Sequence, residues 1–254
     1  MIIKFKRIHH HLKASAIRIV RRPLKWSLLN GYLTVFHDVE GGFSKHGNAE
    51  SSYNGVSNFL DIERKNNTRT TYNVVGRLFY DMPDIIHMIV HGGHDIASHS
   101  YDHRILTTLS RRQLDDDIRR TKEIFLRFNL SCRGLRSPQS KWSFALMQAM
   151  LANGLQWSAE RDKSRFPYVI RTNPDQSLVR FPILMDDWEY VAGALSPDQM
   201  LSKLMHRADI IRKQRCYGAI GFHPWIHGED EGRLAVYSKF LENAQKMDGL
   251  ILLT

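Results

Sequence analysis

Short apolar runs alternate with segments of helical periodicity along most of the chain. Continuous hydrophobicity in short runs is typical of parallel strands, which are buried on both faces. The predicted strands are 32–36, 71–75, 96–97, 131–135, 156–158, 179–184, 219–222 and 250–253. This order predicts an α/β fold with a parallel sheet and right-handed crossovers, either closed as a barrel or open and doubly wound.

Three helices are predicted from their caps. Ser110 and Ser196 each precede a helical pattern of apolar residues and have a glutamine three positions later, which is the pattern of a capping box. A third helix is predicted over 143–153, because Gly154 stands where a glycine commonly ends a helix.

Length and composition indicate one folded domain. A chain of 254 residues can bury one substantial core, and 43% hydrophobic with 24% charged residues excludes disordered and fibrous classes. We expect a single catalytic domain over 31–254, preceded by a basic arm at 1–30. Within the domain, the polar stretch 44–68 predicts a loop over the sheet edge, with a short helix at 56–62 as the alternative.

Positive charge is in excess, with 36 Lys and Arg against 26 Asp and Glu, a formal net charge of +10. This balance favours anionic partners, phosphate-bearing sugars among them. In the basic arm the charges alternate with apolar residues, a pattern that permits peripheral contact with an anionic membrane, although a solvated arm is the simpler interpretation. No nucleic-acid-binding motif accompanies the charge, so nucleic acid is not an expected partner.

The cellular compartment is predicted from the absence of membrane-spanning and secretory-signal patterns in the sequence. No run approaches the ~18 apolar residues of a membrane span, and the N-terminus has no continuous apolar core of a secretory signal. Cys132 and Cys216 are the only cysteines and have no metal-ligand spacing. We expect a cytoplasmic protein with two reduced thiols.

Polar side chains with catalytic chemistry follow the predicted strands. Because all carboxyl ends of a parallel barrel open on one face, these distant segments should converge there. The candidates are His37, Asp38, Glu40, His99, Asp102, His103, Arg136, Pro138, Asp186, Asp187, Trp188, His223, Pro224 and Trp225.

The sharpest pattern among them is a pair of histidines, His99 and His103. Four residues apart, they can face the same way on a helical turn and bind one metal. A carboxylate from Asp38 or Glu40 would complete a three-ligand site with open positions for water and substrate, as in catalytic zinc sites.

The sequence around this pair resembles the polysaccharide deacetylase family, carbohydrate esterase family 4. Residues 93–125, GHDIASHSYDHRILTTLSRRQLDDDIRRTKEIF, are similar to the second family motif and the helix after it, and 70–76, TTYNVVG, to the strand before. The similarity extends from about residue 33 to the C-terminus. It implies a distorted (β/α) barrel, hydrolysis of N-acetyl groups on saccharides, and a divalent metal, usually zinc, in some members cobalt or nickel. Together with the cytoplasmic placement and the basic balance, this predicts a role in cell-surface glycan biosynthesis.

The resemblance also implies roles for individual residues. His99 and His103 would bind the metal, and His223 would be the general acid that protonates the leaving amine. Arg136 would orient the catalytic carboxylate, and Asp187 would contact that arginine. The resemblance also makes Trp188 a wall of the sugar pocket. Apart from the resemblance, Trp142 and Trp225 are further candidate sugar-stacking rings, with core packing as the alternative, and Pro138 is a candidate substrate contact.

The first family motif departs from the usual pair of adjacent aspartates and leaves two registers open. In one, His37 is the base and Asp38 binds the metal. In the other, Asp38 is the base and Glu40 binds the metal, which we prefer because alternation along an extended segment puts both carboxylates on one face. The third motif, Arg-Ser-Pro-Gln-Ser from Arg136, is also incomplete, so the identity of the sugar does not transfer from the family.

Two further functions compete with this hypothesis. One is a metal-free hydrolase of C–N bonds in a small cyclic amide, against which the presence of both His99 and His103 argues. The other is a catalytically inactive homologue that binds carbohydrate without turnover.

Overall fold

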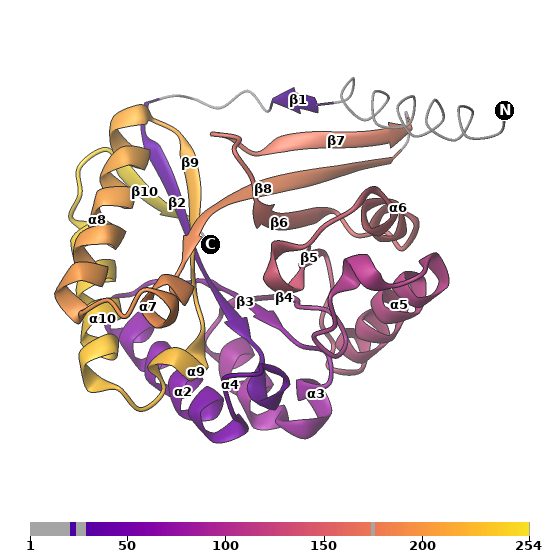
Figure 1. Ribbon diagram of the computed structural model, residues 1–254, viewed down its shortest axis with the longest axis horizontal. Coiled ribbons are helices and arrows are strands. Elements are labelled where there is room, and N and C mark those ends of the chain that lie inside the picture. Colours follow the sequence, from indigo (N-terminus) through magenta and orange to yellow (C-terminus); the bar gives the residue numbers. More distant parts are fainter. Residues whose placement is uncertain (1–20, 24–28, 174–175, 254) are drawn as a thin grey trace, which may run out of the picture.

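Seven parallel strands form a closed barrel in the computed structural model, which describes residues 21–23, 29–173 and 176–253 (Figure 1). Strand β9 closes the ring, since it pairs in parallel with both β2 and β8. The barrel strands are β2 (Gly31–Val39), β3 (Thr71–Val74), β4 (Asp95–Ser98), β5 (Gly134–Arg136), β6 (Trp157–Arg161), β8 (Gln176–Asp186) and β9 (Tyr217–Phe222). Of the two predicted sheet arrangements, the barrel is therefore confirmed.

Three more strands extend the barrel at its amino-terminal end. Strand β10 (Leu250–Leu253) pairs with the first half of β2, on the edge that β3 occupies in the second half. Strand β7 (Tyr168–Asn173) runs antiparallel to β8, and β1 (Arg21–Pro23) pairs with β7. Strand β1 lies within the predicted basic arm, whose residues 1–20 and 24–28, and with them the hypothesis of membrane contact, lie outside the described residues.

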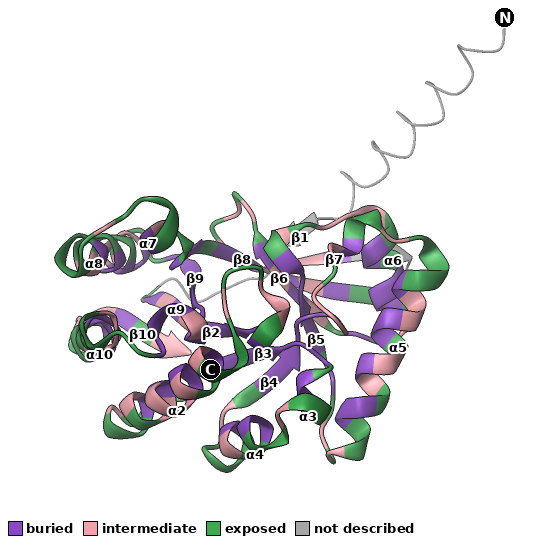
Figure 2. Ribbon diagram, turned by 60° about the horizontal axis from the view of Figure 1, so that its bottom comes forward, coloured by how far each residue is buried: buried purple, intermediate pink, exposed green. Residues whose placement is uncertain are grey.

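Helices cover the outside of the barrel (Figures 1 and 2). The capping boxes at Ser110 and Ser196 are confirmed, and each begins a predicted helix. The third predicted helix is also present, and the Ser143 side chain caps it by accepting a hydrogen bond from the Leu146 amide. None of the described helices has the length and apolarity needed to cross a bilayer. The helices are α2 (Ala49–Lys65), α3 (Leu78–Asp81), α4 (Pro83–His91), α5 (Arg111–Arg127), α6 (Phe144–Ala152), α7 (Trp188–Ala192), α8 (Pro197–Gln214), α9 (Pro224–His227) and α10 (Glu231–Gln245), with short 3-10 helices η1 (Gly41–Phe43), η2 (Leu106–Thr108) and η3 (Pro138–Ser140).

The predicted loop at 44–68 is wrong, because most of it forms α2. Asn48 caps this helix in a capping box with Ser51. The small residues that suggested a loop serve close packing instead: a Cβ on Gly55 would lie 2.0 Å from a carbonyl oxygen at the start of α9. The polar composition therefore reflects a tight helix–helix contact and a solvated outer face.

Side chains of β2 alternate between the barrel interior and the helical layer. Leu33 and Val35 join the apolar core shared with α8 and α10, and Phe36 belongs to a smaller cluster with residues of β8 and β9. The same alternation continues to the carboxyl end of β2, so it decides which residues there face the mouth of the barrel.

Candidate functional site

The carboxyl end of β2 places two carboxylates in one cavity and a histidine outside it. Asp38 and Glu40 line this cavity, which has a volume of about 650 Å³. His37 is fully buried on the opposite face, where its Nε2 donates to Glu63 on α2 over 2.6 Å and lies 3.2 Å from the Tyr237 hydroxyl of α10. This geometry is compatible with the register in which Asp38 and Glu40 are the functional pair.

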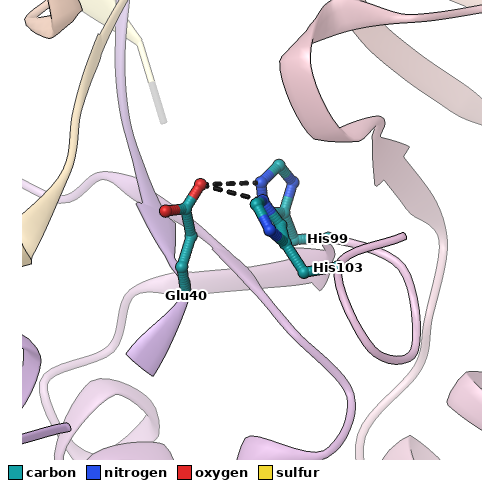
Figure 3. A group of neighbouring side chains, drawn as sticks. All are labelled: Glu40, His99 and His103. Carbon is teal, nitrogen blue, oxygen red and sulfur yellow. Dashed lines mark ion pairs between the residues drawn. The ribbon is translucent and has the colours of Figure 1, made fainter. Parts of the chain in front are cut away.

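Glu40, His99 and His103 form a cluster that could hold a metal ion (Figure 3). One ligand atom from each lies within 4.8 Å of the others, and Glu40 Oε1 is 3.6 Å from His99 Nε2 and 2.9 Å from His103 Nε2. The Nδ1 of His99 lies 2.7 Å from the Arg136 carbonyl oxygen, so it carries the hydrogen and leaves the Nε2 lone pair facing the cluster. Trp225 Nε1 donates to the second oxygen of Glu40 over 2.9 Å.

The two histidines converge from a loop, and the expectation of a helical turn is wrong. Ser100 and His103 both adopt left-handed backbone conformations, with φ of 67° and 60°. The His103 amide donates to the Ser100 hydroxyl over 2.9 Å, and the amide of Tyr101 donates to buried Asp117 over 3.1 Å. These contacts bend the chain after β4 so that both imidazoles reach Glu40.

Asp38 is held as an anion beside the cluster of Glu40, His99 and His103. Asn73 donates to its Oδ1 over 2.9 Å, and Arg136 Nε lies 3.5 Å from its Oδ2. Burial raises the pKa of this carboxyl, but the charges of Arg136, His99 and His223 more than offset burial, and the pKa is lowered overall. An ionised carboxylate in this position can accept a proton from water.

Arg136 is itself fixed by groups that the sequence reasoning missed. It donates to the Ser137 carbonyl and the Ser140 hydroxyl, each over 2.7 Å, and lies 3.4 Å from Glu160. Glu160 is fully buried and lies two residues after the predicted strand 156–158, in the same position relative to its strand as Asp38. Asn73 lies in 70–76, the stretch that carried part of the family resemblance. The sequence therefore contained a signal for both Glu160 and Asn73.

His223 follows β9 and faces both carboxylates of the cavity. Its Nε2 lies 3.8 Å from Asp38 Oδ2 and 3.7 Å from Glu40 Oε1. Its Nδ1 contacts Asp187 over 2.6 Å, and its backbone amide donates to the same carboxylate over 2.7 Å. Burial lowers the pKa of His223, but the charge and hydrogen bond of Asp187 and the two cavity carboxylates raise it to about 10.

Asp187 therefore contacts a different partner from the one predicted. It binds His223 and, over 2.9 Å, His227, while no contact with Arg136 is found among the described residues. The reason is the turn after β8, which directs Asp187 toward β9, where its amide donates to the Gly221 carbonyl over 3.0 Å, while Arg136 lies on β5, on the other side of β6. Burial raises the pKa of Asp187, but the two histidines lower it to about 2.

Aromatic rings form part of the cavity wall. Trp188 and Trp225 both line the cavity, with ring centroids 6.2 Å apart. The ring of His46 lies 5.2 Å from Trp188. Flat rings at the mouth of a polar cavity suit the apolar face of a sugar.

Pro138 and Trp142 do not line the cavity. Pro138 is buried. Trp142 lies under Arg180, whose guanidinium carbon is 4.5 Å from the centroid of the Trp142 ring. The residues between them, Gln139 and Lys141, line the cavity instead. The η3 turn produces this exchange, since Gln139 takes a left-handed conformation with φ of 56°.

Comparison with known proteins identifies relatives in sequence. The sequence model of the polysaccharide deacetylase family matches residues 50–158, a segment that contains His99, His103 and Arg136. A chitooligosaccharide deacetylase from Sinorhizobium fredii is 29% identical over 115 residues, which cover 42% of this chain and 52% of the relative. Matches to the curated relatives span about a third to a half of their lengths.

Solved structures with the same fold cover most of the chain. A Mycobacterium smegmatis structure assigned to the polysaccharide deacetylases superposes with a TM-score of 0.80 at 21% identity, over 90% of this chain and 88% of the other. An allantoinase superposes with a TM-score of 0.77 at 18% identity, over 86% and 85% of the two chains. At these identities the structures establish a shared fold.

Proposed function

This chain belongs to the polysaccharide deacetylase family, and on that premise we propose that it is a metal-dependent hydrolase that removes an N-acetyl, or another N-acyl, group from an amino sugar. One observation carries the proposal. Glu40, His99 and His103 each offer one atom that could bind a metal, these atoms lie within 4.8 Å of one another, and the three side chains share a cavity with a carboxylate and a further histidine. The chitooligosaccharide deacetylase among its relatives supports the substrate class.

The chemistry of the donor set fits a divalent metal. Glu40, His99 and His103 would hold it through one carboxylate oxygen and two imidazole nitrogens, a set typical of catalytic zinc, with cobalt and nickel as alternatives. When bound, such a metal supplies a Lewis acid for the amide carbonyl and lowers the pKa of water. His99 is already oriented for binding by its contact with the Arg136 carbonyl.

The residues around the cluster perform the proton transfers. Asp38 takes a proton from the attacking water, and Arg136 and Asn73 keep the carboxylate ionised and oriented. His223, protonated through its contact with Asp187, gives its proton to the amide nitrogen as the C–N bond breaks. The products are a carboxylate, acetate for an N-acetyl group, and the free amine of the sugar.

The two competing functions differ from this one in metal content and turnover. A hydrolase of cyclic amides without a metal would share the fold, as the allantoinase does, but would not need the convergence of Glu40, His99 and His103. An inactive homologue would bind saccharide without releasing acetate. The convergence of a base, an acid and three candidate metal ligands supports a metal-dependent deacylase over both.

The wider setting is proposed from charge and sequence. We assign catalysis to a domain over 31–254, with the basic arm at 1–30 outside it. The net charge of +10 supports a saccharide that carries phosphate. We place the protein in the cytoplasm, in the biosynthesis of cell-surface glycans.

Metal content and acetate release test the proposal together. Wild-type protein should bind one zinc-like ion per chain by inductively coupled plasma mass spectrometry and release acetate from chitooligosaccharides. His99→Ala and His103→Ala should lose both properties, while Asp38→Asn should keep the metal and lose turnover. The control is His87→Ala, an exposed histidine on α4. Wild-type protein that takes up no metal even after zinc addition would refute the proposal.

A further inference from the structure

Cationic side chains surround the mouth of the cavity, and the proposed reaction does not use them. They are Lys45, which follows η1, Arg104, which follows the metal-binding loop, Lys141, which follows η3, and Arg161 at the end of β6. Among the described residues that line the cavity, the only acid besides Asp38 and Glu40 is Asp186. The mouth therefore has a net positive charge independent of any metal.

The four cations differ in their partners. Arg104 donates to Asp102 over 2.7 Å, and Arg161 donates to Asp186 over 2.8 Å. These two ion pairs hold the guanidinium groups in place and partly balance their charge. The two lysines are exposed and have no carboxylate partner in the part of the chain that the structure describes. Their ammonium groups are consequently available to a ligand.

We propose that Lys45 and Lys141 form a subsite for an oxyanion, phosphate or carboxylate, that the saccharide substrate carries outside its N-acyl group. The inference rests on the proposed function for the position of the sugar, because the two lysines line the same cavity as Asp38 and Glu40. Like charges that line one cleft together attract an anionic ligand, and an ammonium group donates charge-assisted hydrogen bonds to an oxyanion.

Positive charge continues beyond the mouth on the side of Arg104. This residue also lines an open groove of about 850 Å³ along α5, where four further arginines and two aspartates contribute to the surface. The added arginines are Arg111, Arg112, Arg119 and Arg120. An anionic saccharide would therefore meet the same sign of charge along its approach, which raises its association rate and makes that rate sensitive to salt.

Binding measured apart from turnover tests the subsite. The zinc-loaded Asp38→Asn protein should be titrated calorimetrically with three saccharides that share the N-acetylglucosamine ring. They are the neutral methyl glycoside, N-acetylglucosamine 1-phosphate and N-acetylmuramic acid, so the two charged probes distinguish phosphate from carboxylate. The same titrations follow in a background that adds Lys45→Met and Lys141→Met, and in one that adds Lys239→Met, an exposed lysine on α10 outside the cavity.

The expected result is tighter binding of at least one charged saccharide, by about two- to fivefold per lysine, as for an ion pair between exposed groups. The preference should disappear in the double lysine variant and persist with Lys239→Met. Equal binding of charged and neutral saccharides, no measurable binding of either charged one, or a preference that survives loss of both lysines would overturn the subsite. A charge preference in a wild-type protein that releases no acetate would instead count against the deacylase function alone.

Discussion

Trp225→Phe should weaken metal binding while it leaves an aromatic ring in the cavity wall. The indole Nε1 donates to Glu40 Oε2 over 2.9 Å, and Glu40 Oε1 faces the two histidines. The indole thus holds the carboxylate with one oxygen, Oε1, toward His99 and His103. A hydrogen bond to a charged group contributes about 1.5–3 kcal/mol, and loss of an outer hydrogen bond to a metal ligand weakens metal binding about 10- to 100-fold.

Competition with a chelator of known affinity measures this effect. The zinc dissociation constant of Trp225→Phe should rise by about 10- to 100-fold, and saturating zinc should restore most of the turnover. Trp188→Phe is the control, because Trp188 lines the same cavity and its indole makes no hydrogen bond among the described residues. Unchanged zinc affinity in Trp225→Phe would show that the indole does not orient Glu40, or that Glu40 is not a ligand.

Three further substitutions test other parts of the structure. Burial raises the pKa of Asp117 to about 7, so the stabilisation from its protonated form is fully present below about pH 4 and is lost as the pH rises through 7. In urea unfolding, the free energy of unfolding of Asp117→Asn should therefore increase relative to that of wild type by up to about 4 kcal/mol between pH 4 and 8. A difference in free energy that does not change with pH would contradict this. Asp187→Asn should lower the pKa of His223 from about 10 and move the alkaline limit of turnover down by about 1–3 pH units; an unmoved limit would exclude His223 as the acid. Gly55→Ala should destabilise the fold by about 1–3 kcal/mol through overpacking, whereas Gly42→Ala, with open space around it, should not; equal effects would contradict the tight contact between α2 and α9.

Local sequence patterns determined the strands, the capped helices and much of the candidate metal site. Strand and helix periodicity is short-ranged, so each apolar run and each serine cap could be read without its neighbours. The alternation of Asp38 and Glu40 along β2 is likewise a local property. The positions of His99, His103 and His223 directly after predicted parallel strands were enough to predict that they lie at one face of the barrel.

Tertiary structure alone decided the contacts between distant polar groups. Asp187 pairs with His223, although the resemblance implied Arg136, because the turn after β8 sets its direction. The two candidate metal ligands, His99 and His103, meet through left-handed backbone in a loop, which a spacing of four residues does not reveal.

Helix α2 and the cavity wall show the same limit. The small polar residues of α2 resemble a loop until α9 is packed against Gly55. Trp142 and Lys141 are neighbours in sequence, yet the η3 turn directs one under Arg180 and the other into the cavity. Sequence periodicity reports which face of an element a residue occupies, whereas its partner across the barrel depends on the path of every intervening loop.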